Sequence, residues 1–195
     1  MLAGHFGIAQ FGKGYRRELP FLLLLVAAYL PDIVRLPEQL LTTRHEVLSH
    51  SLPVVLVMGV VLGALWLLRG GNWVGATVLA IVCFLHWPAD LFTGCKPTTF
   101  DGPWLGLVSY RRPVNDMLVE GALIIGGWYF ARRRGVRMGS LLLAFVLAAQ
   151  LAFLLSLYWD STFIIGQREW IWNPRQSLAP QPHVLEATPC RNPGS

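Results

Sequence analysis

Five apolar runs separated by short polar clusters dominate the hydrophobic pattern of this chain. The runs cover residues 19–34, 51–68, 73–92, 114–131 and 141–159. A transmembrane helix needs about 20 predominantly apolar residues. The pattern therefore predicts an all-α fold, a polytopic membrane helix bundle with about five transmembrane helices. A shorter apolar stretch, 3–12, predicts a partial N-terminal helix that enters the membrane and turns back.

Two polar segments interrupt this series. Residues 35–49 form a polar connection that we expect to be partly helical. Residues 93–113 are too polar and too rich in Gly and Pro to cross a membrane, so they predict a long loop. Pro88 is expected to end or kink the third apolar run near His86.

The last part of the chain differs in composition from the rest. Five prolines between Pro174 and Pro193 exclude regular structure after the fifth run. We therefore expect a transmembrane helical domain over residues 1–159 and an irregular, Pro-rich extramembrane tail over residues 160–195.

Composition supports a membrane location. Mean hydropathy is +0.48, and 54% of the 195 residues are hydrophobic whereas 14% are charged. These values lie outside the usual range of soluble globular domains. The composition therefore indicates the lipid bilayer as the immediate surroundings of most of the chain.

Charge is distributed in a way that indicates topology. The chain has a net charge of +5, but its basic residues lie in short clusters between apolar runs, so no nucleic-acid partner is expected. An excess of Lys and Arg in short loops marks the cytoplasmic side. This predicts a multi-pass membrane protein with its short basic loops in the cytoplasm and an external C-terminal tail. The basic residues of the cytoplasmic side are Lys13, Arg16, Arg17, Arg69, Arg132, Arg133, Arg134 and Arg137.

The three cysteines show no spacing typical of a thiolate site. Cys83, Cys95 and Cys190 form no CxxC pair, and Cys83 lies within an apolar run. We therefore expect neither a disulfide nor a thiolate zinc site.

Polar residues that can bind a metal stand at the ends of three apolar runs. Asp32 closes the first run, His45 and His50 precede the second, and His86 and Asp90 close the third. If the chain crosses a membrane back and forth, all of them lie at the external face. Polar groups inside a membrane are costly, so their convergence favours a metal site.

The chemistry of these residue types suits a hydrolytic metal. His86 and Asp90 are four residues apart, so in a helix they project from the same face. Neutral imidazole and carboxylate suit Zn²⁺, Mn²⁺ or iron. A metal held by three protein groups with one open position lowers the pKa of bound water toward about 7. A simpler interpretation of each histidine is an interfacial hydrogen-bonding residue.

The second histidine pair has a geometric constraint. His45 and His50 are about 140° apart on an ideal helix, so both can face one ion only if His45 precedes the helix. Glu46 shares a face with His50, and Ser49 shares one with His45. Glu46 or Ser49 is therefore a candidate for orienting a ligand histidine.

Taken together, these motifs resemble a known family. They are Gly4-His5, Pro31-Asp32, HxxxxHS from His45 to Ser51, and HxxxD from His86 to Asp90. Motifs of this kind in this order resemble those of the membrane-bound, metal-dependent hydrolases related to the LexA-regulated inner-membrane protein of enteric bacteria. The resemblance covers about residues 3–134 and implies, by position, the ligands His5, Asp32, His45, His50, His86 and Asp90. Asp32 and Asp90 are also the catalytic candidates, as bases instead of ligands.

The chain also shares a loop motif with a branch of this group and departs from the family at two positions. In this chain the motif is the segment from Phe100 to Leu107, which resembles a loop found in that branch. In the branch a glutamate follows in the next span, and here that residue is Glu120. We expect Glu120 near the cavity that contains the candidate ligands. Val34 stands where the family often has a second acid, and Glu46 stands where it has an arginine. The loss of an acid argues against a dinuclear site.

Three hypotheses follow. The first is a membrane hydrolase with a mononuclear or dinuclear Zn or Mn site, acting at the external face on a phosphoester or other ester of a lipid-like molecule. The second is a non-catalytic subunit of a larger membrane protein complex that is contacted through the fifth helix and the C-terminal tail. The third is haem or chlorophyll ligation by a membrane histidine such as His86.

Overall fold

Helices make up most of the described chain, as the hydrophobic pattern predicts. The computed structural model describes residues 3–41, 48–99, 104–106, 113–137 and 139–159. The all-α prediction is confirmed, with one two-stranded pairing added. In chain order the elements are α1 (Gly4–Tyr15), α2 (Phe21–Leu41), the 3-10 helix η1 (Leu48–His50), α3 (Leu52–Leu68), α4 (Trp73–Phe84), α5 (His86–Thr93), β1 (Lys96–Pro97), β2 (Trp104–Leu105), α6 (Pro113–Arg133) and α7 (Ser140–Trp159).

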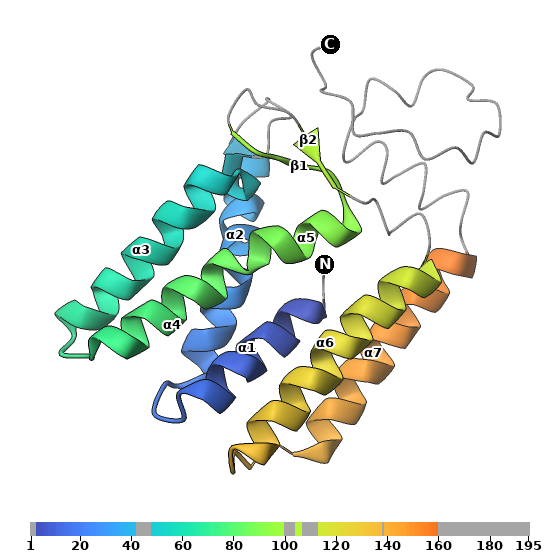
Figure 1. The fold of residues 1–195 in the computed structure, drawn as a ribbon. Helices are drawn as coiled ribbons and strands as arrows, with labels where there is room; N and C mark the ends of the chain where they lie inside the picture. Colours follow the sequence, from blue (N-terminus) through green and yellow to red (C-terminus); the bar gives the residue numbers. More distant parts are fainter. Residues whose placement is uncertain (1–2, 42–47, 100–103, 107–112, 138, 160–195) are drawn as a thin grey trace.

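Helix α1 lies in the middle of the bundle (Figure 1). On one side α2 contacts both α1 and α4, and α3 packs along α4. On the other side α6 packs along α1, and α7 packs on α6. The turns that join α1 to α2, α3 to α4 and α6 to α7 lie toward one end of the bundle, and η1, β1 and β2 lie toward the other. The short basic turns are thus separated from the end that carries the polar motifs.

Glycine residues allow α1 to lie directly against α6. A Cβ atom on Gly7 would overlap the backbone of Leu123, and a Cβ atom on Gly127 would overlap the carbonyl oxygen of Gly7. A Cβ atom on Gly14 would lie 2.7 Å from the ring of Phe130. Glycine is a poor intrinsic helix former. In α1 it is required because the two backbones touch.

Helix α2 extends further than the apolar run predicts. It continues from Phe21 through Pro31 and Pro37 to Leu41, whereas the run ends near residue 34. The residues after 34 add about two turns, which form the helical part expected of the polar connection. The end of the apolar run near residue 34 marks where α2 stops being buried. The helical hydrogen bonds of α2 continue to Leu41.

A break between α4 and α5 lies near the position predicted from Pro88. Helix α4 ends at Phe84 and α5 begins at His86. Pro88 falls in the first turn of α5, where the backbone N–H groups have no intrahelical partner, so proline is tolerated there. The break places His86 and Asp90 on a separate short helix.

Within the described residues, one helical run has the length and apolar composition of a membrane span, Trp73–Phe92. The helices Leu52–Leu68 and Ser140–Ala152 are apolar but shorter. Helices α2 and α6 contain ionisable residues, Asp32 and Glu120 among them. Length and composition thus identify one candidate span among these helices, where the hydrophobic pattern predicts five.

The segment predicted to form a long loop contains the strand pairing. Strands β1 and β2 are antiparallel, with Lys96 opposite Leu105. Cys95, directly before β1, is disulfide-bonded, so the expectation of no disulfide is wrong. Cys83 is a buried free thiol. A disulfide requires proximity in the fold and no particular spacing along the chain, so the cysteine pattern could not reveal it.

Gly127→Ala is expected to destabilise the bundle, because the added Cβ overlaps the backbone of α1. Overpacking of this kind costs about 1–3 kcal/mol. Gly121→Ala on the same helix is the matched control, since no described heavy atom lies within 4 Å of its Cβ position. Alanine there should be neutral or stabilising. Thermal unfolding in mild detergent measures both, and equal melting temperatures for the two variants would contradict the close contact of α1 with α6.

Candidate metal centre

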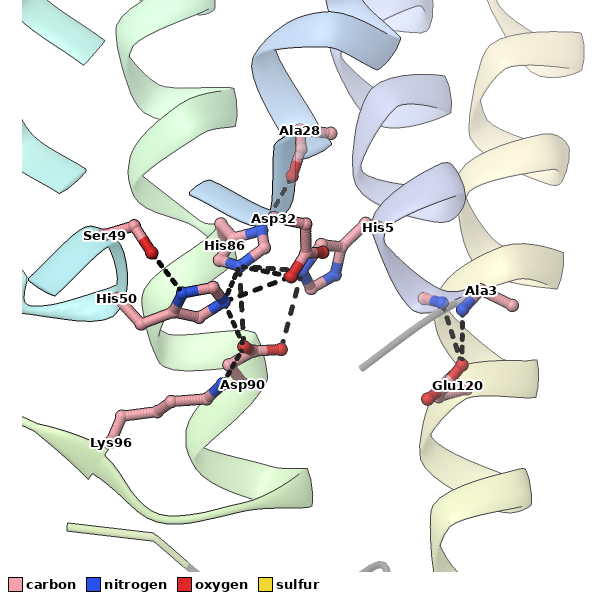
Figure 2. Close-up of polar contacts among 11 residues, drawn as sticks. Ala3, His5, Ala28, Asp32, Ser49, His50, His86, Asp90, Lys96 and Glu120 are labelled. Carbon is pink, nitrogen blue, oxygen red and sulfur yellow. Dashed lines mark hydrogen bonds and ion pairs between the residues drawn. The ribbon is translucent and has the colours of Figure 1, made fainter. Parts of the chain in front are cut away.

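Three histidines and two aspartates from four elements meet at one place. His5 lies in the first turn of α1, Asp32 in α2 and His50 at the end of η1, while His86 and Asp90 lie one turn apart on α5. Figure 2 shows their side chains directed toward one another. The positions of four of these residues follow from the sequence motifs, and the resemblance adds His5. Packing of α1 between α2 and α6 brings His5 to the others.

The Nε2 atoms of the histidines form the centre of the cluster. Nε2 of His86 lies 3.4 Å from Nε2 of His5 and 3.3 Å from Nε2 of His50. In a tetrahedral zinc site with Zn–N bonds of about 2.0–2.1 Å, two ligand nitrogens lie about 3.3–3.4 Å apart. Each of these two spacings therefore fits a pair of imidazoles that ligate one small divalent cation.

Both carboxylates border the same point. Oδ1 of Asp90 lies 3.5 Å from Nε2 of His5, and its Oδ2 lies 3.5 Å from Nε2 of both His50 and His86. Oδ1 of Asp32 lies 3.1 Å from Nε2 of His50 and 3.9 Å from Nε2 of His86. Two overlapping groups of three could each hold a metal ion, and both include His86: His5, Asp32 and His86, and His50, His86 and Asp90.

Hydrogen bonds at Nδ1 orient two of the rings. Nδ1 of His86 donates to the backbone carbonyl of Ala28 at 2.8 Å. A neutral imidazole has a single N–H, so Nε2 of His86 then carries a lone pair that faces the cluster. The hydroxyl oxygen of Ser49 lies 3.1 Å from Nδ1 of His50, in agreement with the orienting role expected for Ser49. Ligand histidines are usually held in this way through their second nitrogen.

Burial controls the charge and the accessibility of the cluster. His5, His50, His86 and Asp90 are almost completely buried. Burial lowers the pKa of His50 to about 4, and the positive charge of Lys96 acts in the same direction. His50 is therefore neutral at pH 7, which is the form that ligates metals. The side chain of Asp32 is 36% exposed, so the cluster is open on the side of this carboxylate.

Lys96 contacts the cluster although no sequence motif identifies it. Its Nζ lies 2.6 Å from Oδ2 of Asp90, and both side chains are buried. A lysine beside a proline in a polar segment has the pattern of an ordinary surface lysine. The contact follows from the pairing of β1 with β2, which the sequence pattern does not predict.

Glu120 has a different role from the one expected of a cavity-lining acid. Its Oε2 accepts hydrogen bonds from the backbone N–H groups of Ala3, at 2.8 Å, and Gly4, at 3.1 Å. A carboxylate at a helix N-terminus satisfies otherwise unpaired donors and interacts favourably with the helix dipole. Glu120 of α6 thus holds the first turn of α1, which carries His5 (Figure 2).

The positions at which the chain departs from the family lie outside the cluster or outside the described residues. Val34 is two residues beyond Asp32 on α2, and its side chain is exposed, so it does not join the buried cluster. His45, a predicted ligand, lies outside the described residues together with Glu46.

Comparisons of the chain with protein-family models, with curated proteins and with solved structures found no match. The resemblance to membrane-bound hydrolases therefore depends on the motifs and on their order along the chain.

Glu120→Ala is expected to lower the melting temperature, because the first turn of α1 loses its acceptor. Loss of a helix cap costs about 0.5–2 kcal/mol. Glu120→Gln should be milder, since an amide oxygen still accepts hydrogen bonds. Glu18→Ala is the control, because Glu18 pairs with Arg16 at the surface, where ion pairs contribute little. An equal loss of stability for Glu120→Ala and Glu18→Ala would show that the cap does not anchor α1.

Proposed function

We propose that this protein is a membrane-embedded, metal-dependent hydrolase. The observation that carries the proposal is that Nε2 of His86 lies 3.4 Å from Nε2 of His5 and 3.3 Å from Nε2 of His50, while the Asp90 carboxylate oxygens lie 3.5 Å from all three Nε2 atoms. His50, His86 and Asp90 would hold the ion, with Asp32 at the open side and His5 beside His86. Zinc is favoured over manganese, because imidazole suits zinc and the nitrogen spacing fits its tetrahedral ligation.

The arrangement favours one ion over two. His86 belongs to both groups of candidate ligands, and its Nδ1 already donates to the carbonyl of Ala28. Its Nε2 lone pair is therefore a single ligand, which cannot serve two ions. Val34, at the position of the second acid of the family, has no donor atom. We therefore favour the mononuclear alternative.

The chemistry divides between the ion and the side chains around it. A bound divalent cation would supply Lewis acidity, which polarises an ester or phosphoryl oxygen and lowers the pKa of water. Asp32, the more exposed carboxylate, accepts the proton of the attacking water. The water oxygen forms a bond to phosphorus or to the carbonyl carbon, and the bond to the leaving oxygen breaks. Asp32 then returns the proton to that oxygen, as a general base and acid.

Apolar side chains on the outside of the bundle support a membrane location with several spans. On α3 the exposed residues include Leu56, Val57, Val60, Val61 and Leu65. Large exposed apolar patches are rare on soluble monomers. A helix that is apolar on all sides is typical of a membrane span. We therefore retain the five-span arrangement as part of the proposal.

The site is proposed to face the outside of the bacterial inner membrane. The short basic turns gather at the opposite end of the bundle, and basic loops favour the cytoplasm (Figure 1). Cys95 is disulfide-bonded beside Lys96, and disulfides persist in oxidising compartments such as the periplasm. Both features support an external site, with the tail from residue 160 on the same side.

A non-catalytic subunit of a larger membrane complex is the second candidate. Helix α7 packs on α6 and exposes Leu141, Phe145, Leu151 and Leu155. This apolar surface suits a neighbouring membrane chain as well as lipid. In that case the cluster would bind no metal and the protein would purify with a constant partner.

Haem or chlorophyll ligation by His86 is not proposed. Nδ1 of His86 is occupied by the carbonyl of Ala28, and Nε2 has a nitrogen of His5 at 3.4 Å and one of His50 at 3.3 Å. These neighbours occupy the space that a planar macrocycle would need at the ligating nitrogen.

Elemental analysis of the protein purified in mild detergent tests the proposal. We expect about one equivalent of zinc per chain, as for a single catalytic site with three protein ligands and one open position. His50→Ala and His86→Ala should each lose the metal, because each removes a central Nε2. His183→Ala is the matched control, since His183 belongs to none of the motifs, and it should retain the metal. A metal-free wild-type protein that co-purifies with a constant partner would overturn the hydrolase in favour of the subunit.

Asp32→Asn and Asp90→Asn should separate proton transfer from metal binding. Asp32→Asn is expected to keep the metal and lose about 10²–10⁴-fold in hydrolysis of bis-p-nitrophenyl phosphate, the usual range for a general base. Asp90→Asn should lose metal as well as activity, because Asp90 contacts all three histidines. Loss of metal from Asp32→Asn alone would reverse the two roles.

A further inference from the structure

Lys96 places a buried positive charge beside the ligand cluster. Its Nζ contacts Oδ2 of Asp90 at 2.6 Å, and that same oxygen lies 3.5 Å from Nε2 of His50 and of His86. Through this oxygen the ammonium group is one contact away from the Nε2 atoms of His50 and His86 (Figure 2). A buried lysine is costly unless it is paired or functional.

The fold fixes Lys96 in this position through several contacts. The indole N–H of Trp87 donates to the carbonyl of Pro97 at 3.3 Å, which ties β1 to α5. Strand β2 pairs with β1 opposite Lys96. A Cβ atom on Gly106, directly after β2, would overlap the carbonyl of Gly94, so the chain also closes tightly before β1. The lysine is thus held by backbone contacts on both sides.

We infer that Lys96 binds a phosphoryl oxygen of the substrate, so that the hydrolase acts on a phosphoester of a lipid and not on a carboxylic ester. This inference rests on the proposed function, since it needs a divalent cation in the cluster. Neutralising the charge of Asp90 does not explain why Lys96 is buried beside it once a metal ion is bound. A carboxylate that ligates a divalent cation is already neutralised by that cation.

The charge balance of the site supports an anionic ligand. Among the described residues of the site, neutral imidazoles, two carboxylates and one ammonium group together with one divalent cation give one net positive charge. A neutral carboxylic ester would leave this charge uncompensated in a buried site, which is unfavourable. A phosphoryl anion compensates it and is recognised by the ammonium group through a charge-assisted hydrogen bond.

The metal and the lysine are expected to respond in opposite directions to one substitution. Lys96→Met removes a positive charge beside the cation, so zinc affinity should be unchanged or higher. The same variant should bind inorganic phosphate about 10–100-fold more weakly, as expected for loss of a hydrogen bond to a charged group. Lys96→Arg keeps the charge and is the matched control, with phosphate affinity near that of the wild type.

Titration calorimetry of the detergent-solubilised, full-length protein tests these effects in two steps, first with zinc and then with inorganic phosphate added to the zinc-loaded protein. Zinc binding by all variants, with phosphate binding weakened only in Lys96→Met, is the supporting result. Loss of zinc from Lys96→Met would show that the lysine merely positions Asp90. If that variant fails to fold, Lys96→Gln replaces it with the same expected losses.

Two further results would overturn the inference at different points. A wild-type protein that binds no zinc removes the proposed function, and with it the inference. Equal phosphate binding by the zinc-loaded wild type and Lys96→Met leaves the hydrolase intact and removes only the role of Lys96.

Dihexanoyl phosphatidic acid, a soluble lipid phosphoester, separates a lipid headgroup from free phosphate. Binding at least as tight as that of inorganic phosphate, again weakened by Lys96→Met, supports a lipid substrate. Binding of inorganic phosphate alone overturns the lipid assignment.

Discussion

The direct contact between the backbones of α1 and α6 is the constraint on which the centre depends. His5 reaches the other candidate ligands only because α1 packs directly against α6, and Gly7 and Gly127 allow that close contact. Glu120 then holds the first turn of α1 by two hydrogen bonds to its backbone. Helix α1, which carries the candidate ligand His5, is thus positioned by α6, which carries none of the candidate ligands.

The burial of the polar cluster is the second constraint on the structure. Five donor residues and one ammonium group lie within a few contacts of one another, and all but Asp32 are nearly inaccessible. Such groups are tolerated when each has a partner. Here Ala28 and Ser49 orient two rings, and Lys96 pairs with Asp90. The polar contacts that stabilise the cluster in the fold are also those that orient the rings of His50 and His86 and the carboxylate of Asp90.

Much of this arrangement could be predicted from the sequence, and the remainder could not for identifiable reasons. Apolar runs mark α3, α4, α6 and α7, because each run is long enough for a helix and is bounded by polar or Gly-containing turns. The motifs containing Asp32, His50 and His86 mark the candidate ligands, because each motif places polar residues at one end of an apolar run. The cap by Glu120, the contact of Lys96 and the disulfide of Cys95 join residues distant in sequence or depend on a short strand pairing. No local pattern of residues reports such contacts.

The cap on α1 also determines when the centre can form. All five donor residues lie within the first 90 residues of the chain, whereas Glu120 and Gly127 are made later. During synthesis the five donor residues therefore leave the ribosome before the helix that holds α1 in place. The cluster becomes complete only when α6 packs beside α1, so its assembly is coupled to that of the later half of the bundle.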